Sequence, residues 1–258
     1  MIGQRFFIEL SYEGTNYHGW QMQPNAVGVQ EVLNKALTTI LRQPIETLGC
    51  GRTDTGVHAK EFFAHFTPLP PEAGAFDASF LDNTTRSLNA ILPHDIAIKK
   101  IIPVHADAHA RFDATSRSYE YHIHFNKDPF KNGYSWLLRD KPDLDLMNQA
   151  AKLLMDHIDF SCFSKSNTQT KTNNCKISQA LWEHTDAGIV FKISADRFLR
   201  NMVRAIVGTL LMVGNKEISP EAIHDIIKSK NRSNAGTSVP ACGLYLTEVR
   251  YPFLVSSN

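Results

Sequence analysis

Residues 48–59 read L-G-C-G-R-T-D-T-G-V-H-A and place one carboxylate, that of Asp54, in a polar segment between glycines. Aspartate and glycine are common turn residues, so a tight turn is the simplest interpretation. The triplet Asp-Thr-Gly is also the nucleus of an aspartic-protease site, but that site needs two carboxylates that share a proton, and the sequence has no second such triplet. Arg52 also opposes a shared proton, because an arginine beside an aspartate keeps the carboxylate ionised. An ionised carboxylate suits a nucleophile or a stabiliser of positive charge.

Strand-like and helix-like hydrophobic patterns alternate on both sides of this segment. The strands are expected at residues 5–12, 61–66, 95–104, 116–125, 176–185, 189–195 and 243–251. The helices are expected at residues 29–41, 77–91, 143–155, 197–213 and 220–230, the last with Ser219 as its N-cap. Because the expected strands and helices do not alternate as regular βαβ units, the sequence predicts an α+β protein with helices covering a sheet. The polar stretch 126–142 is rich in turn formers and predicts a boundary between two halves, residues 1–125 and 126–258.

The bulk composition is that of an ordinary globular protein, with 43% hydrophobic and 21% charged residues in a chain of 258. No apolar run approaches the ~20 residues that a membrane span requires, and the N-terminal sequence does not resemble a signal peptide. The four cysteines lie far apart without a C-x-x-C pair, which argues against a disulfide framework or a zinc ribbon. The expected compartment is therefore the cytoplasm. A net charge of +1 argues against a non-specific nucleic-acid coat protein but permits a local basic groove.

Three arginines, Arg197, Arg200 and Arg204, are spaced i, i+3 and i+7 in the expected helix 197–213 and would form one narrow stripe. Such a stripe is usually the solvated face of an amphipathic helix. However, no Asp or Glu lies between residues 197 and 213. Arginines without an acidic neighbour on the same face favour phosphates or a catalytic carboxylate as partners.

Arginines also alternate with aromatic residues in the segment 105–121, which contains Arg111, Phe112, Arg117, Tyr119 and Tyr121. Arginines that contact phosphates and aromatic rings that stack on unpaired bases are the two elements of single-stranded RNA recognition. Packing of a half-buried strand is the simpler explanation for Tyr121. Tyr119 lies nearer the end of the expected strand, where it can present its ring and hydroxyl to a cleft.

Two histidine pairs have spacings that a metal site can use, His105 with His109 and His122 with His124. Neither pair has a cluster of cysteines or carboxylates beside it, and a metal site needs three or four ligands. No metal is therefore expected.

Four ordered blocks resemble the tRNA pseudouridine synthase A family: G-R-T-D-T-G-V-H-A at 51–59, H-A-R-F-D-A-T-S-R-S-Y-E-Y at 109–121, M-V-R-A-I-V-G at 202–208 and A-C-G-L-Y-L at 241–246. The resemblance extends over nearly the whole chain, from S-Y-E-G-T-N-Y-H-G-W-Q at 11–21 to Tyr251-Pro252. One departure is Thr55, where the family usually has alanine. This small change beside Asp54 is not expected to remove activity.

The resemblance implies a pseudouridine synthase fold in which two RRM-like α/β halves join through a central mixed sheet beside a basic active-site cleft. It implies conversion of uridine to pseudouridine at positions 38, 39 and 40 of the tRNA anticodon stem-loop by a homodimer, with the dimerisation surface in the C-terminal half. Asp54 matches the essential aspartate, which acts as nucleophile or stabilises a sugar cation. The other matched residues are Arg52 in the same loop, the active-site Tyr119, Arg204 as basic partner of Asp54 and Leu244 lining the pocket.

This reaction is an isomerisation, so no cofactor is expected, and none of the sequence motifs indicates one. Arg111, Arg197 and Arg200 are further candidates for contacts with the RNA. Two other hypotheses fit parts of the sequence. A catalytically silent RNA-binding protein would keep the arginines and aromatics, but would not need Asp54. A dimeric aspartic protease would use Asp54 but not the basic residues.

Overall fold

The computed structural model describes residues 4–69, 76–164 and 172–254, which form two compact units. The first unit contains residues 1–114 and 247–258, and the second contains residues 115–246. The chain thus divides at Ala114, before the expected boundary at residue 125, and its C-terminal segment belongs to the first unit. The last strand, β9 (Leu244–Arg250), contributes residues to both units.

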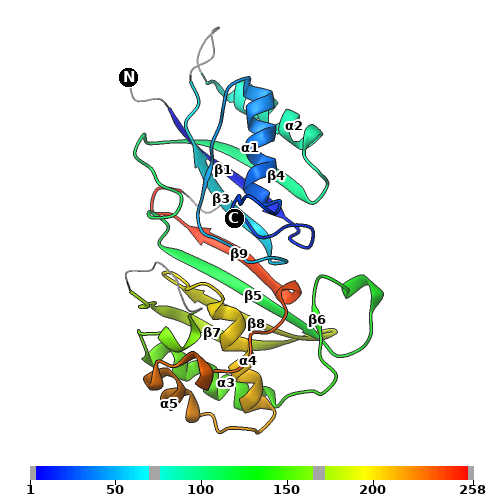
Figure 1. Cartoon of the computed structure of the whole chain (residues 1–258), viewed down its shortest axis with the longest axis vertical. Helices are drawn as coiled ribbons and strands as arrows, with labels where there is room; N and C mark the ends of the chain where they lie inside the picture. Colours follow the sequence, from blue (N-terminus) through cyan, green and yellow to red (C-terminus); the bar gives the residue numbers. More distant parts are fainter. Residues whose placement is uncertain (1–3, 70–75, 165–171, 255–258) are drawn as a thin grey trace. The chain divides into compact units, whose positions relative to one another are not determined.

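The first unit is built on an antiparallel sheet in which β1 (Arg5–Tyr12) lies between β3 (His58–Phe66) and β4 (Ile96–Val104) (Figure 1). Phe6 pairs with Phe66 on one side, and Ile8 pairs with Ile101 on the other. The short strand β2 (Leu48–Gly49) pairs with β3, so the segment that contains Asp54 connects two neighbouring strands. Helices α1 (Val29–Leu41) and α2 (Ala78–Ile91) pack on each other, and α2 packs on β4.

The core of this unit is aromatic. Phe6, Phe7 and Ile8 are almost fully buried in succession, so β1 is covered on both faces. Trp20 stacks on Phe62 of β3 with ring centroids 4.1 Å apart. The apolar stripe of α1 that the sequence predicted is buried at Val29, Leu33, Ala36 and Leu37. Helix α2 begins where it was expected, because the Asp77 carboxylate caps it by accepting the backbone N–H of Phe80 at 2.7 Å.

In the second unit, β8 (Gly188–Ala195) lies between β5 (Ser116–His124) and β7 (Ile177–Thr185), and all these pairings are antiparallel. The short strand β6 (Trp136–Leu137) adds to β5 in parallel. Among the described residues of this unit, three helices accompany the sheet, namely α3 (Leu144–Leu153), α4 (Met202–Gly214) and α5 (Ala222–Ser229). Helix α3 packs on both α4 and β7. The 3₁₀ turns of the unit are η1 (Pro129–Lys131), η2 (Leu154–Asp156), η3 (Ser161–Phe163), η4 (Arg232–Asn234) and η5 (Ala241–Gly243).

The expected α+β class is confirmed, and most expected elements lie within a few residues of their observed positions. Strand β3 is longer than expected and begins at His58, directly after the segment that contains Asp54. Helix α5 begins at Ala222 with Glu221 in the N-cap position, whereas the carbonyl of the expected cap, Ser219, accepts the N–H of Ala222 at 3.1 Å. The largest difference concerns the expected helix 197–213, since α4 begins only at Met202.

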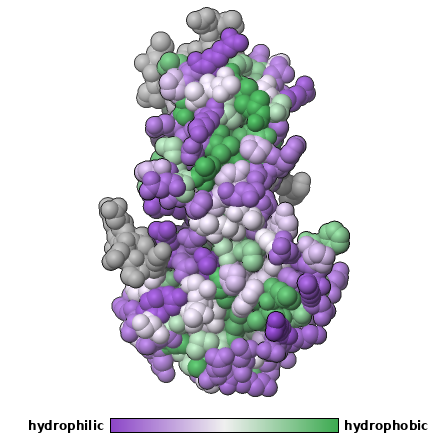
Figure 2. All heavy atoms as spheres, turned by 45° about the vertical axis from the view of Figure 1, so that its right-hand side comes forward, coloured by the Kyte–Doolittle hydropathy of each residue, from purple (hydrophilic) through white to green (hydrophobic). Residues whose placement is uncertain are grey.

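Hydrophobic residues reach the surface in patches separated by hydrophilic ones (Figure 2). Among the described residues, every helix is too short or too polar to span a lipid bilayer.

Candidate functional site

Asp54 lies in the connection between β2 and β3 of the first unit and is half-buried, whereas its neighbours Arg52 and Thr55 are exposed. The connection is a tight turn in which the N–H of Val57 donates to the carbonyl of Asp54 at 3.2 Å, and Gly56 has a φ of 77°. The turn expected from the residue types is therefore present. It presents one carboxylate at the start of a long buried strand.

The segment 13–20 packs its main chain directly against this turn. Gly19 has a φ of 82°, and a Cβ atom at that position would lie 2.1 Å from the carbonyl oxygen of Thr53. A Cβ atom at Gly14 would lie 2.1 Å from the carbonyl oxygen of Val57, on the other side of Asp54. No side chain fits between the two main chains at either point. The backbone on both sides of Asp54 is therefore held by close contact, which is a geometry that only glycine permits.

Polar contacts from the segment 13–20 and from Tyr12, the last residue of β1, also hold this turn. The N–H of Gly56 donates to the carbonyl of Tyr17 at 3.3 Å, and the Tyr12 hydroxyl lies 2.9 Å from Oγ1 of Thr53. His58 is buried, and its Nδ1 accepts the N–H of Gly14 at 3.0 Å. These contacts satisfy polar groups that would otherwise be costly to bury. Sequence reasoning did not assign this supporting role to the segment 13–20, although its two glycines were the available signal.

Tyr119 lies in β5 of the second unit, paired with Ile193 of β8, and is half-buried. Its ring meets the ring of Phe198 edge to face, with centroids 5.1 Å apart and an interplanar angle of 85°. Phe198 lies in the segment between β8 and α4, so this segment packs against the Tyr119 ring in a geometry that aromatic pairs favour. Tyr121 is buried two residues further along, as expected, and its hydroxyl donates to the carbonyl of Pro240 at 2.7 Å.

The expected stripe of Arg197, Arg200 and Arg204 on one helix is wrong. Helix α4 begins only at Met202, and Asn201 before it has a left-handed backbone with a φ of 66°. Arg197 and Arg200 therefore lie in an irregular segment, and helical spacing does not apply to them. The start of this segment is fixed by the Asp196 carboxylate, which accepts the backbone N–H groups of Lys176 and Arg197, both at 2.7 Å.

Arg204 is the member of the three that lies on α4, in its first turn. Its Nε donates to the carbonyl of Val239 at 2.7 Å, and the N–H of Val239 donates back to the carbonyl of Arg204 at 3.3 Å. The side chain is thus attached to the loop 235–240, which leads through η5 to β9. Leu244 begins β9 and is buried.

The loop 235–240 lies directly on the backbone of α4. A Cβ atom at Gly208 would lie 1.8 Å from the carbonyl oxygen of Thr237. The N–H of Gly236 donates to Oγ1 of Thr209 at 2.8 Å, and this hydroxyl donates to the carbonyl of Ala205 at the same distance. Arg232 also holds the loop, donating to the carbonyl of Gly236 and to the Ser238 hydroxyl, both at 3.0 Å.

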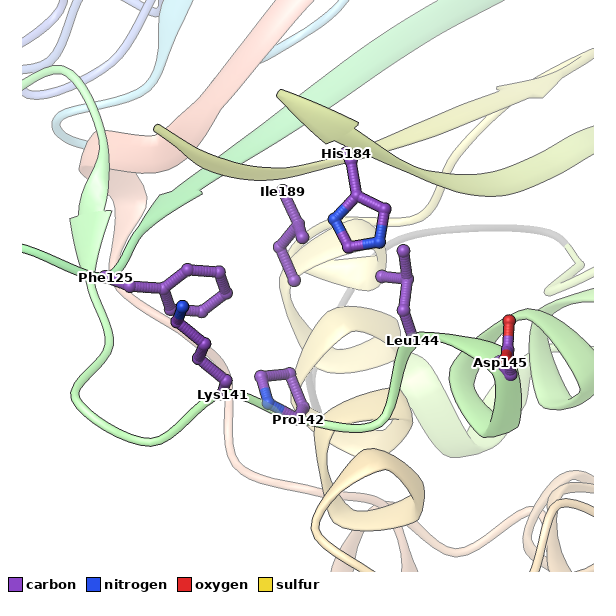
Figure 3. Close-up of a pocket in the computed structure, with 7 residues that line it drawn as sticks. All are labelled: Phe125, Lys141, Pro142, Leu144, Asp145, His184 and Ile189. Carbon is purple, nitrogen blue, oxygen red and sulfur yellow. The ribbon is translucent and has the colours of Figure 1, made fainter. Parts of the chain in front are cut away.

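The remaining candidates are distributed over both units. Arg111 is exposed in the first unit, in the turn after β4. The described residues include no group of three or more His, Cys, Asp or Glu side chains that could hold a metal ion. A pocket of about 280 Å³ in the second unit contains none of the candidate residues (Figure 3). Its lining residues are Phe125, Lys141, Pro142, Leu144, Asp145, His184 and Ile189.

Comparison with known proteins gives a consistent result. The profile of a family described as tRNA pseudouridine synthase matches residues 150–252. A tRNA pseudouridine synthase A from Porphyromonas gingivalis is 52% identical over 96% of this chain and 97% of its own length. The tRNA pseudouridine synthase A from Bacteroides fragilis is 50% identical over 98% of this chain and 98% of its own length. The one from Clostridium acetobutylicum is 38% identical over 95% of this chain and 98% of its own length. The chain belongs to the tRNA pseudouridine synthase A family.

Membership confirms the resemblance that the sequence motifs indicated, and the mixed sheets and helices agree with the pseudouridine synthase fold. It also identifies the reaction class as isomerisation of uridine to pseudouridine in tRNA. The two other hypotheses, a silent RNA-binding protein and an aspartic protease, receive no support from these relatives.

The contact between Gly19 and Thr53 leads to a test of how the synthase positions Asp54. Gly19→Ala adds a Cβ atom 2.1 Å from the Thr53 carbonyl at a φ of 82°, so the residue before Asp54 must move. Because a displacement of about 1 Å costs roughly 10²-fold in rate, we expect pseudouridine formation to fall by that factor, together with a lower melting temperature. Gly51→Ala is the matched control, since nothing lies within 4 Å of its added Cβ atom. Equal behaviour of the two variants would contradict this role of Gly19.

The hydroxyl of Thr209 offers a second test, on the loop that holds Arg204. Thr209→Val keeps the shape of the side chain but leaves the buried N–H of Gly236 without its acceptor, which costs about 1–3 kcal/mol. We expect faster hydrogen exchange at Gly236 and slower turnover by the synthase. Thr84→Val is the control, because the buried Thr84 hydroxyl donates only within α2, to the carbonyl of Phe80. Loop exchange as slow as in the parent would show that the hydroxyl does not hold the loop.

Proposed function

We propose that this protein converts uridine to pseudouridine at positions 38, 39 and 40 of the tRNA anticodon stem-loop, with Asp54 as the catalytic carboxylate. The observation that carries the proposal is the close packing of Gly14 and Gly19 on both sides of Asp54. A carboxylate that reacts at a ribose carbon needs a fixed position, and a backbone held on both sides supplies one.

The reaction breaks the bond between C1′ and N1, rotates the uracil and joins C1′ to C5. The proton on C5 then leaves, and N1 gains one, so atoms and electrons balance without a redox cofactor. Asp54 attacks C1′ or stabilises the sugar cation, and both routes require the ionised carboxylate. We propose that Tyr119 stacks on the uracil and that its hydroxyl assists removal of the C5 proton. Leu244 lines the pocket for the base.

Arg204 is proposed as the basic partner of Asp54. Its bond to the Val239 carbonyl uses Nε, and the two terminal nitrogens of a guanidinium form an edge that suits a carboxylate. A side chain already held at Nε loses little freedom when it forms such a pair. Arg52 is proposed to occupy the space that the flipped nucleotide leaves and to steady it outside the stack. Arg111, Arg197 and Arg200 are proposed to contact the RNA, the last two as separate contacts because they do not share a helix with Arg204.

We further propose that the active species is a homodimer. Each chain would consist of two RRM-like halves, and the dimerisation surface would lie in the C-terminal half. The proposed compartment is the cytoplasm, where the tRNA substrate is found. A protomer of 258 residues has limited surface both to hold the tRNA body and to admit uridines from adjacent positions to one pocket. Analytical ultracentrifugation at the assay concentration is expected to give a dimer. A fully active monomer would contradict the proposal.

The role of Asp54 is tested by Asp54→Asn, which keeps the shape of the side chain and removes its charge and nucleophilicity. We expect turnover to fall by about 10⁴-fold or more, equivalent to ~5.4 kcal/mol of activation free energy. Binding of tRNA is expected to persist, because phosphates and stacked bases are contacted by other residues. The measurement is release of tritium from tRNA labelled at uracil C5, with tRNA affinity measured separately.

Asp82→Asn, at an exposed position of α2, removes the same charge away from the site and should leave turnover unchanged. If the Asp54→Asn protein binds tRNA and releases tritium within tenfold of the parent, Asp54 is not the catalytic carboxylate. If the parent itself binds tRNA without releasing tritium, the protein is a silent RNA-binding protein. Mapping of the modified residues decides separately whether positions 38, 39 and 40 are the targets.

A further inference from the structure

Phe112 exposes 74% of its surface in the turn that follows β4 of the first unit. Exposure of a large apolar side chain is not by itself unusual. The Phe112 ring, however, stacks on the His109 ring with centroids 4.2 Å apart and an interplanar angle of 29°. The ring is therefore supported from below while much of its surface remains in contact with solvent.

His109 is itself fixed by the turn. Its Nδ1 accepts the backbone N–H groups of Arg111 and Phe112, at 3.1 and 3.2 Å. An Nδ1 that accepts two hydrogen bonds carries no proton, so the ring is neutral with its proton on Nε2. Burial also lowers the pKa of His109, which favours the same neutral form. The backbone N–H of His109 donates to the Asp113 carboxylate at 2.7 Å and closes the turn.

A column of rings continues from His109 into the core. His65 of β3 meets His109 edge to face at 4.8 Å, and its Nδ1 accepts the N–H of Ala110 at 3.1 Å. Burial lowers the pKa of His65 to about 4, so this ring is also neutral at physiological pH. Phe7 of β1 lies against His65 at 6.2 Å with an interplanar angle of 24°. The four rings of Phe7, His65, His109 and Phe112 thus lead from a fully buried strand to the surface.

Two further hydrogen bonds attach the turn to the unit. The guanidinium of Arg5 donates to the carbonyl of Ala108 at 2.9 Å, and the Tyr251 hydroxyl donates to the carbonyl of Ala110 at 2.6 Å. Both alanines are fully buried. The exposed ring is therefore presented by a turn that is already ordered, and a ligand that stacks on it does not have to order the turn.

We propose that Phe112 is a stacking platform for an unpaired base of the tRNA substrate, with Arg111 beside it for the adjoining phosphate. The Arg111 guanidinium lies over the Phe112 ring, 5.7 Å from its centroid, so a cationic group on an exposed side chain accompanies the ring. Proteins bind single-stranded nucleic acids by combining aromatic faces, on which the bases stack, with cationic groups that contact the phosphates. The proposal rests on tRNA as the substrate and does not depend on which uridines are modified.

A second protein surface fits this turn less well. Protein interfaces bury a contiguous apolar patch at their centre, whereas the residues on both sides of Phe112 are the charged Arg111 and Asp113. A single ring beside a cation matches one base and one phosphate. The partner that fits this turn best is therefore the tRNA substrate.

The test compares the tRNA affinities of Phe112→Ala, Phe112→Leu and Phe112→Trp with that of the parent. A stacked base contributes about 1–3 kcal/mol, so the Ala variant should bind tRNA roughly 5- to 150-fold more weakly. The Leu variant should lose a similar factor, because it keeps the apolar character without a π face. The Trp variant should bind at least as tightly as the parent. Phe130→Ala is the control, since Phe130 is 90% exposed in η1 and has no aromatic neighbour among the described residues.

Photocrosslinking of tRNA substituted with 5-iodouridine should label Phe112 in the parent and lose that label in the Leu variant. Affinity of Phe112→Ala within twofold of the parent, or equal weakening by Phe130→Ala, would overturn the proposal. A weaker affinity that coincides with loss of self-association in sedimentation would also overturn it, in favour of an interface between copies of this chain. If the parent modifies uridines outside the anticodon stem-loop, the proposed function fails, while the affinity series still decides the role of Phe112.

Discussion

Close contact between two main chains, with no side chain between them, is the constraint on which the surroundings of Asp54 and those of Arg204 both depend. In the first unit, Gly19 brings the segment 13–20 against the carbonyl of Thr53, next to Asp54. In the second unit, Gly208 brings α4 against the carbonyl of Thr237, in the loop that binds Arg204 through Val239. A Cβ atom at either glycine would lie about 2 Å from a carbonyl oxygen, and backbone of this kind cannot move aside cheaply. Backbone packing therefore fixes the main chain next to Asp54 and the loop whose Val239 carbonyl accepts the Arg204 Nε–H.

Such packing explains why buried polar side chains accompany each of these two contacts. Where two main chains meet without water, each N–H and carbonyl needs a partner within the protein. His58 supplies an acceptor for the N–H of Gly14, and Thr209 supplies one for the N–H of Gly236. Arg232 satisfies several acceptors of the loop 235–240 at once, because a guanidinium has five donors in a fixed plane. These side chains stabilise the backbone around Asp54 and around Arg204 and are themselves outside the proposed chemistry.

The sequence predicted the strands and most helices because a period of two or of 3.6 residues reports which face is buried. The prediction of one helix carrying all three arginines failed. The helical apolar pattern of α4 extends back to Phe198, whereas the helix itself begins at Met202. The left-handed Asn201 interrupts the helix, and asparagine is among the few residues that adopt this conformation readily. Tertiary contacts select that conformation: the Asn201 side chain binds Ser238, a residue far along the chain. The role of Gly19 was likewise not predictable from the residue alone, because its partner, Thr53, lies in another segment. Asp54 became a candidate for catalysis because Arg52 lies two residues before it and because the surrounding block resembles a known family, whereas the residue types alone predict only the turn that is present.

An enzyme that acts on a base within folded RNA must first take that base out of its stack, at a cost of a few kcal/mol. Contacts elsewhere on the RNA have to offset this cost, and they do so best when the protein groups that form them are already ordered. The turn that contains Phe112 fits this requirement, since its rings and its backbone are held before any ligand arrives. A flexible loop with the same residues would lose conformational entropy on binding, so stacking on it would contribute less to the free energy of binding. In the roles proposed for them, rigid support of Asp54 and rigid presentation of Phe112 serve the same end, which is to reserve the binding energy of tRNA for distortion of the RNA.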